Sequence, residues 1–159
     1  MVTRKNFDYK GSVILGMHDA IVSLAGLIAG LGFTLTDTNI IILSCIISSI
    51  TASLSMGAAN YLAVKTINKQ HAIHAAVYTG GAYMATCALL ILPLMIFYNR
   101  MVALLFVFFT IVCIIYFFNF IFYRKSQFTR HFYEMLTICL AVSLIAFLIG
   151  EAAKYFLGI

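Results

Sequence analysis

The sequence predicts an all-α integral membrane protein with five transmembrane helices. The chain has 159 residues, of which 64% are hydrophobic and only 9% are charged, a balance that soluble domains do not reach. Its mean hydropathy is +1.05. A bilayer core of about 30 Å takes about 20 helical residues to cross. Runs of that length occur at residues 11–33, 39–64, 75–97, 101–123 and 132–157.

The five runs differ in composition, and each composition indicates a packing role. The first is rich in glycine and the second in serine and alanine, as in helices that approach one another closely. The third and fifth are mixed apolar runs. The fourth concentrates Phe and Tyr, which suits contact with lipid, and its Asn119 is expected to hydrogen-bond a neighbouring helix. Only short connections separate the runs, so we expect one five-helix domain over residues 1–159.

Basic residues predict the orientation of the chain. Eight of the ten fall on one side of the predicted bundle and two on the other, a strong positive-inside pattern. The amino terminus is therefore expected in the cytoplasm and the carboxyl terminus outside or in a lumen. Basic residues at the edges of apolar runs also argue against a nucleic-acid partner. The eight are Arg4, Lys5, Lys10, Lys65, Lys69, Arg124, Lys125 and Arg130, and the two are Arg100 and Lys154.

The four cysteines are spread one to a helix from the second run to the fifth. No two of them form a CxxC pair or share a connection. Free cysteine is commonly a small buried hydrophobic residue, and that interpretation is preferred to a redox or metal role. They are Cys45, Cys87, Cys113 and Cys139.

Asp19 is the residue that most needs an explanation. It follows Lys10 by nine residues, which places it about 13 Å into the membrane. A carboxylate at that depth costs about 2.5–3.5 kcal/mol, so such residues face a bundle interior or an aqueous cavity and mark ion or proton pathways. A structural hydrogen bond with a neighbouring helix is the alternative.

Asp19 shares one helical face with small and polar residues, at about 100° per residue. Within that face, Gly26 and Gly30 form a GxxxG pair that allows another helix to approach closely. We therefore expect Asp19 to look into a helix contact and not into lipid. The face comprises Ser12, Gly16, Asp19, Ser23, Gly26 and Gly30.

The second run presents a similar face around Met56. Because Met56 precedes Lys65 by nine residues, an antiparallel hairpin would bring it to about the depth of Asp19. A single methionine on a helix is more often a packing residue. The face also holds Cys45, Ser49, Ala52, Ser53, Ala59, Asn60 and Ala63.

A carboxylate and a thioether at one depth predict an intermediate divalent ion. Fe(II), Co(II) or Mn(II) suits this donor pair better than Mg or Ca, which prefer oxygen alone. Two donors are too few for binding. If the small-residue face of the first helix pairs with its own copy about a two-fold axis, the site gains two Asp19 and two Met56.

Two segments resemble the vacuolar iron transporter family. "GMHDAIVSLAGLIAGLG" is similar to the first-span signature of that family and "SLSMGAANYLAVKT" to its second, while "LTICLAVSLIAFLIGEAAKYFLG" is similar to its fifth span. The resemblance implies a homodimer that exports cytoplasmic Fe(II), and often Mn(II), in exchange for protons along a path between the first and second spans. It places the membrane aspartate on Asp19 and the membrane methionine on Met56. Ser23, Ser49 and Ser53 lie on the same two helical faces and are expected as secondary lining residues.

The chain departs from the family pattern at two places. His18-Asp19-Ala20 stands where the family has Asn-Asp-Gly, and Asn60 stands where it has glutamate. An amide oxygen can ligate a metal but cannot carry a proton. The glutamate-rich metal-binding domain between spans two and three is also missing. In that connection, His71 and His74 could share a helical face at metal-ligand spacing, although histidines without a function are commoner in loops.

The sequence therefore predicts a divalent-metal transporter with no tightly bound cofactor, whose cargo is Fe(II) or Mn(II) and whose partners are a second copy and the lipid bilayer. A bacterial plasma membrane is expected. Three alternatives stay open: a non-transporting scaffold or regulatory subunit, an uncoupled cation channel, and an intramembrane enzyme. The enzyme is disfavoured because no Ser/His/Asp, HExxH or paired-carboxylate pattern is present.

Overall fold

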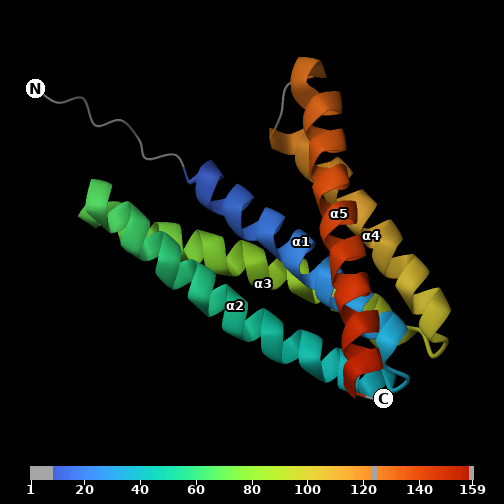
Figure 1. The fold of residues 1–159 in the computed structure, drawn as a ribbon. Helices are drawn as coiled ribbons and strands as arrows, with labels where there is room; N and C mark the ends of the chain where they lie inside the picture. The colour runs from blue at the N-terminus through green and yellow to red at the C-terminus, as the bar shows by residue number, and fades with distance from the viewer. Residues whose placement is uncertain (1–8, 123–124, 158–159) are drawn as a thin grey trace, which may run out of the picture.

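The computed structural model describes residues 9–122 and 125–157 and confirms the all-α class. It contains five helices long and apolar enough to cross a membrane, and no described residue lies in a strand (Figure 1). Arg4, Lys5 and Arg124, which the orientation prediction counts, lie outside the described residues. The helices are α1 (Lys10–Thr34), α2 (Thr38–Ile67), the 3-10 turn η1 (Lys69–His71), α3 (Ala72–Ile96), α4 (Arg100–Phe122) and α5 (Lys125–Leu157).

Helix α5 differs most from its predicted bounds. It begins at Lys125, seven residues before the predicted 132, because hydropathy marks only the part of a helix that suits lipid, while a polar first turn remains helical. The other helices begin and end within three residues of their predicted spans. His74, expected in a connection, lies in the first turn of α3.

Side chains at the turns explain why the helices stop where they do. The Asp37 carboxylate accepts a hydrogen bond from the Asn39 backbone at 2.8 Å and caps the start of α2. Asn68 accepts from the Gln70 backbone at 3.2 Å between α2 and α3. The Arg100 guanidinium donates to a carbonyl at the end of α1. Capping groups satisfy backbone N–H groups that a helix end leaves unpaired.

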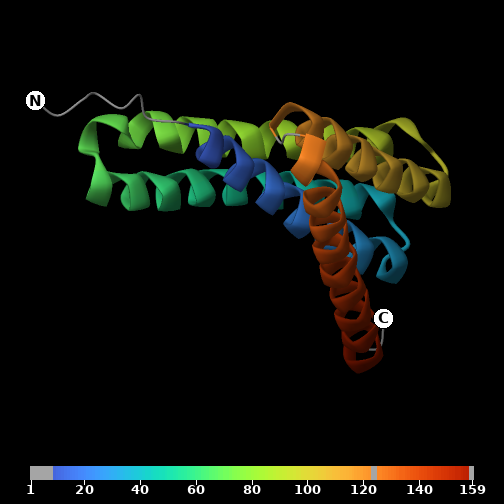
Figure 2. The same cartoon turned by 90° about the horizontal axis from the view of Figure 1, so that it is seen from above.

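Helices α1, α2 and α3 form one packed unit, and α4 and α5 are added to it. Helices α2 and α3 lie side by side along their length, and α1 crosses them (Figure 1). Helix α4 packs against α3, whereas α5 packs mainly on α1. Figure 2 shows α5 running away from α2 and α3 toward its C-terminal end. Only 11% of the most apolar part of α5 is buried inside the chain, so most of this helix is available to lipid or to a partner.

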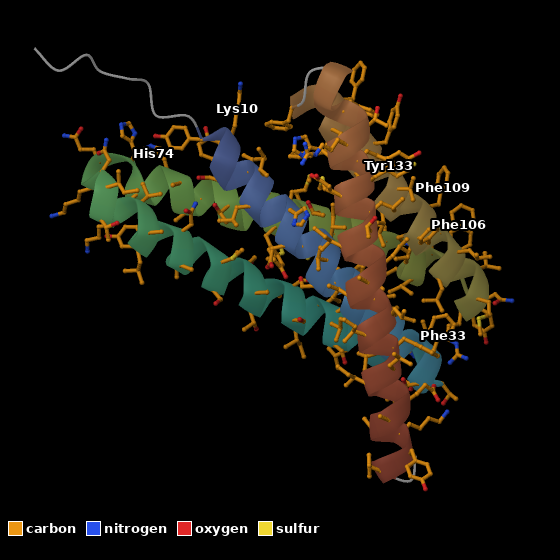
Figure 3. The ribbon with its side chains drawn as sticks, turned by 45° about the horizontal axis from the view of Figure 1, so that its top comes forward. Lys10, Phe33, His74, Phe106, Phe109 and Tyr133 are labelled. Atoms are coloured by element: carbon orange, nitrogen blue, oxygen red, sulfur yellow. The ribbon has the colours of Figure 1, made fainter. Side chains whose placement is uncertain are left out.

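Helix α4 buries one side and exposes most of its aromatic residues on the other. Val107, Ile111 and Ile115 belong to the core, while Phe106 and Phe109 are 44% and 63% exposed and project away from the bundle (Figure 3). Asn119 is fully buried and donates hydrogen bonds to the Ile115 carbonyl at 2.8 Å and, across to α5, to the Met135 sulfur at 3.4 Å.

The cysteines do not all behave as buried hydrophobic residues. Cys45, Cys87 and Cys139 are buried, as expected for small apolar side chains, but Cys113 on α4 is exposed. All four thiols are free. The prediction of four buried cysteines is therefore wrong at Cys113, where α4 turns its outer side away from the bundle.

Candidate functional site

Asp19 lies in the middle of α1 and is half-buried. Its carboxylate interacts electrostatically with Tyr83 and Cys87, so it lies near the polar side of α3. Among the described residues, none donates a hydrogen bond to Asp19 or forms an ion pair with it. An unpaired carboxylate in the membrane is costly. A cation or a proton at Asp19 would compensate this charge.

Polar contacts join α1 to α3 on either side of Asp19. The Tyr83 and Ser23 hydroxyls are 2.6 Å apart toward one end of the contact. Toward the other end, the Thr79 hydroxyl donates to the Ser12 carbonyl at 3.0 Å. Gly16 lies between these two contacts, and its Cα faces the backbone of Thr79 so closely that a Cβ would overlap the carbonyl oxygen. The two helices therefore meet almost backbone to backbone beside Asp19.

Asn60 joins three helices on the side of Asp19 that lies toward the start of α1. Its side-chain nitrogen on α2 lies 3.0 Å from the Ser12 hydroxyl of α1, and 2.6 Å from the Thr79 hydroxyl and 3.2 Å from the Ala75 carbonyl of α3. An NH₂ group has two hydrogens, so these acceptors share them. The amide of Asn60 is thus occupied in holding α1, α2 and α3 together, and only its oxygen is left for an ion.

Met56 lies about one turn of α2 from Asn60 and is half-buried against the main core. The contact between Asn60 and Ser12 sets the register of the antiparallel pair α1 and α2. By that register Asp19 lies opposite about residue 53, and Met56 lies about one turn nearer the C-terminal end of α2. Asp19 and Met56 are therefore neighbours in depth, offset by about one turn.

The two serines expected to line a path, Ser49 and Ser53, point into the protomer, where each is 3% exposed. The Ser53 hydroxyl donates to the Ile50 carbonyl at 3.0 Å, and the Ser49 hydroxyl lies near the Cys87 sulfur of α3. Helix α2 exposes another set of hydroxyls, which sequence reasoning missed although their spacing of four, three and four residues marks one helical face. A groove of about 570 Å³ is lined by Ser44, Ser48, Thr51 and Ser55, together with Ile47 and Ala52.

The glycines of α1 contact two different helices of the same chain. Gly16 packs on α3, whereas Gly26 faces Val142 and Gly30 faces Ala146 of α5, where a Cβ at Gly30 would lie 3.1 Å from the Ala146 carbonyl oxygen. We expected the whole face to be available to a second copy. In the structure, α5 occupies its glycine end and α3 contacts it at Gly16, while Asp19 is half-buried and Ser23 is exposed.

His71 and His74 lie beside one tyrosine, Tyr9, where α2 and α3 are joined. The Tyr9 hydroxyl is 2.6 Å from His71 Nδ1, and the rings of Tyr9 and His74 lie 6.1 Å apart. His74 and Lys10 lie at the same end of the molecule (Figure 3). Within residues 9–122 and 125–157, no three His, Cys, Asp or Glu side chains gather into a group that could hold a metal ion.

Comparison with known families matches residues 11–71 to the VIT family. The matched stretch contains α1, α2 and η1, and with them Asp19, Met56 and Asn60. A search of curated proteins found no match for the chain.

Proposed function

We propose that this chain is a metal ion transporter of the VIT family, as the match over residues 11–71 suggests, and that it exports Fe(II), and also Mn(II), from the cytoplasm in exchange for protons. The observation that supports this most is Asp19, a carboxylate in the middle of a membrane helix with no hydrogen bond or ion pair among the described residues. The family and the five apolar helices indicate an integral membrane transporter rather than an enzyme. We place it in a bacterial plasma membrane.

Exchange follows from the chemistry of one carboxylate. A metal ion binds the deprotonated form, so a proton taken up by Asp19 competes directly with the ion. Asn60 cannot take part in this competition, because an amide does not ionise and its nitrogen is already bound to Ser12 and Thr79. The coupling therefore depends on Asp19, while Asn60 positions α1 and α2 around it.

A second copy supplies the donors that one chain lacks. No three ionisable donors gather within the described residues, so the ion needs two Asp19 and two Met56 across a two-fold axis. Two features support this arrangement. Half-buried Asp19 and exposed Ser23 lie on α1, and the hydroxyls of Ser44, Ser48, Thr51 and Ser55 on α2 would otherwise meet lipid. A two-fold contact through α1 and α2 would turn both sets toward one polar path.

The test is metal uptake into proteoliposomes that contain an internal pH dye. Wild type should move Fe(II) and Mn(II) with opposing proton movement, and Asp19→Asn should move neither metal. The matched control is Asp37→Asn, which makes the same chemical change in the outer turn, where asparagine caps a helix as well as aspartate does. Met56→Ala should reduce Fe(II) flux more than Mn(II) flux, because the thioether is the softer donor. Undiminished flux in folded Asp19→Asn would refute the mechanism.

Asn60 also favours a second candidate, a family member that no longer transports and acts as a membrane scaffold or regulatory subunit. At the position where the family has a glutamate, Asn60 instead makes hydrogen bonds to Ser12 and Thr79 that hold neighbouring helices together. This candidate predicts no metal flux in wild-type vesicles and an effect of Asp19 substitutions on assembly alone. Flux without proton movement would instead indicate an uncoupled channel.

A further inference from the structure

The packing of α2 against α3 brings together two cysteines that the sequence separates by a whole helix. The two helices approach most closely at their glycines. A Cβ at Gly80 would lie 3.1 Å from the Ser53 carbonyl oxygen, and a Cβ at Gly57 would lie 3.2 Å from the Ala76 carbonyl oxygen. These contacts fix the register of the antiparallel pair.

Cys45 and Cys87 occupy matching positions in that register. Cys45 precedes Ser53 by eight residues and Cys87 follows Gly80 by seven, so each lies about two turns beyond the Ser53–Gly80 contact. Both side chains are 0% exposed and belong to the same core cluster. The two thiols also interact electrostatically, as expected of neighbours. The hairpin of α2 and α3 therefore buries a facing pair of thiols.

A buried hydroxyl lies next to this pair. Ser49 is one turn from Cys45 on α2 and is 3% exposed, and its Oγ makes no hydrogen bond of good geometry within the described residues. It lies within hydrogen-bonding reach of the Cys87 sulfur. A neutral thiol is only a weak acceptor, so this buried hydroxyl is poorly satisfied. Its proton is available to a charged sulfur, which would be a strong acceptor.

We propose that Cys45 and Cys87 form a two-coordinate site for a soft monovalent cation, Cu(I) or its analogue Ag(I), with Ser49 donating a hydrogen bond to a bound sulfur. Thiolate ligands select Cu(I), and this ion is stable with two sulfur ligands in a line. An ion that needs three or four donors does not find them among the described residues. On binding, each thiol releases its proton to solvent and forms one Cu–S bond, without a change of oxidation state.

This site is distinct from the proposed Fe(II) path. Its ligands are soft thiolates within one protomer, whereas the path uses Asp19 and Met56 at the contact between two copies. The proposal predicts retention of Cu(I) rather than its transport, because both ligands are wholly buried. It can therefore be tested on purified protein without any flux measurement.

The experiment is an anaerobic titration of purified full-length protein with Cu(I), in competition with a chromophoric Cu(I) chelator and with a reductant that keeps thiols free. Wild type should bind one Cu(I) per chain. Cys45→Ser and Cys87→Ser should each weaken binding by about 100-fold or more, since loss of an outer-shell partner alone costs 10–100-fold. Cys139→Ser, a buried thiol on α5, and Cys113→Ser, the exposed thiol on α4, are the controls and should bind as wild type.

Ser49 has a matched control one turn away. Ser49→Ala should weaken Cu(I) binding by about 10-fold, as for other second-shell hydrogen bonds. Ser53→Ala should leave it unchanged, because the Ser53 hydroxyl already donates to the Ile50 carbonyl. This pair of variants removes the same group from the same helix face, so a general effect of serine loss would appear in both.

X-ray absorption at the copper edge makes the test independent of how well the variants fold. Wild type loaded with one Cu(I) should show two sulfur ligands and no nitrogen. A single sulfur, a nitrogen ligand, or failure of wild type to compete with the chelator would overturn the proposal. Equal loss of binding in Cys139→Ser and Cys87→Ser would do the same, because it would trace the effect to the fold.

Discussion

Replacing Gly16 by alanine tests the close contact on which the geometry around Asp19 depends. The new Cβ would overlap the Thr79 carbonyl oxygen and lie 2.9 Å from the carbonyl carbon and 3.2 Å from Cα. These are backbone atoms in the middle of α3 and cannot rotate away. Helices α1 and α3 must therefore move apart to admit one methyl group.

The expected cost has two parts. Overpacking a close contact costs about 1–3 kcal/mol. Separation also lengthens the hydrogen bonds of Ser12 with Thr79 and Asn60, both now 3.0 Å, and such bonds average about 0.6 kcal/mol each within membranes. The sum is about 2–4 kcal/mol. Alanine returns about 1 kcal/mol of helix propensity, so the free energy of unfolding should fall by about 1–3 kcal/mol.

The assay is reversible unfolding in mixed micelles of SDS and a mild detergent, followed by far-UV circular dichroism. Gly81→Ala is the matched control, because it gains the same propensity in the middle of α3 and its Cβ would meet nothing within 4 Å. The difference between the two variants isolates the steric term and should be about 2–4 kcal/mol. If Gly16→Ala unfolds within about 0.5 kcal/mol of Gly81→Ala, the backbone contact between α1 and α3 is not as described.

Three other substitutions test hydrogen bonds in the same assay. Tyr83→Phe and Ser23→Ala should each lower the free energy of unfolding by about 0.6 kcal/mol, because each removes the same hydrogen bond of 2.6 Å. The double variant should therefore lose no more than either single variant. Additive losses would contradict this. Asn119→Leu should change the free energy of unfolding by less than about 1 kcal/mol in either direction. Among the described residues the Oδ1 of Asn119 is buried without a partner, so removing this oxygen offsets the loss of the weak hydrogen bond to Met135. A loss of stability above about 2 kcal/mol would show that the amide holds α4 and α5 together.

The sequence was sufficient to predict the five helices and to single out Asp19, because both follow from the distance a helix rises per residue and from the cost of a charge in lipid. It also indicated which residues of α1 share a face. It could not indicate which helix that face meets. Gly26 and Gly30 pack on α5 and Gly16 on α3, and no spacing within α1 distinguishes the two partners.

The sequence also could not predict the register between neighbouring helices. Ser49 and Ser53 were expected to line a path, but the hairpin turns them inward and leaves Ser48 and Ser55 outside. Serine is small and polar enough for either environment, so composition alone does not choose. The pairing of Cys45 with Cys87 likewise depends on where α2 and α3 touch, which only the contacts of Gly57 and Gly80 reveal.

The attachment of α5 to the glycine end of α1 has a consequence for the order of synthesis. Gly30 emerges from the ribosome 116 residues before its partner Ala146, which at about 5–20 residues per second is an interval of roughly 6–23 s. From residue 96 onward α1, α2 and α3 are complete, while Gly26 and Gly30 still lack their partner helix. The glycine surface of another nascent chain could then occupy the place of α5. Correct assembly therefore requires that α5 be synthesised and packed on α1 before two unfinished chains associate through their glycines.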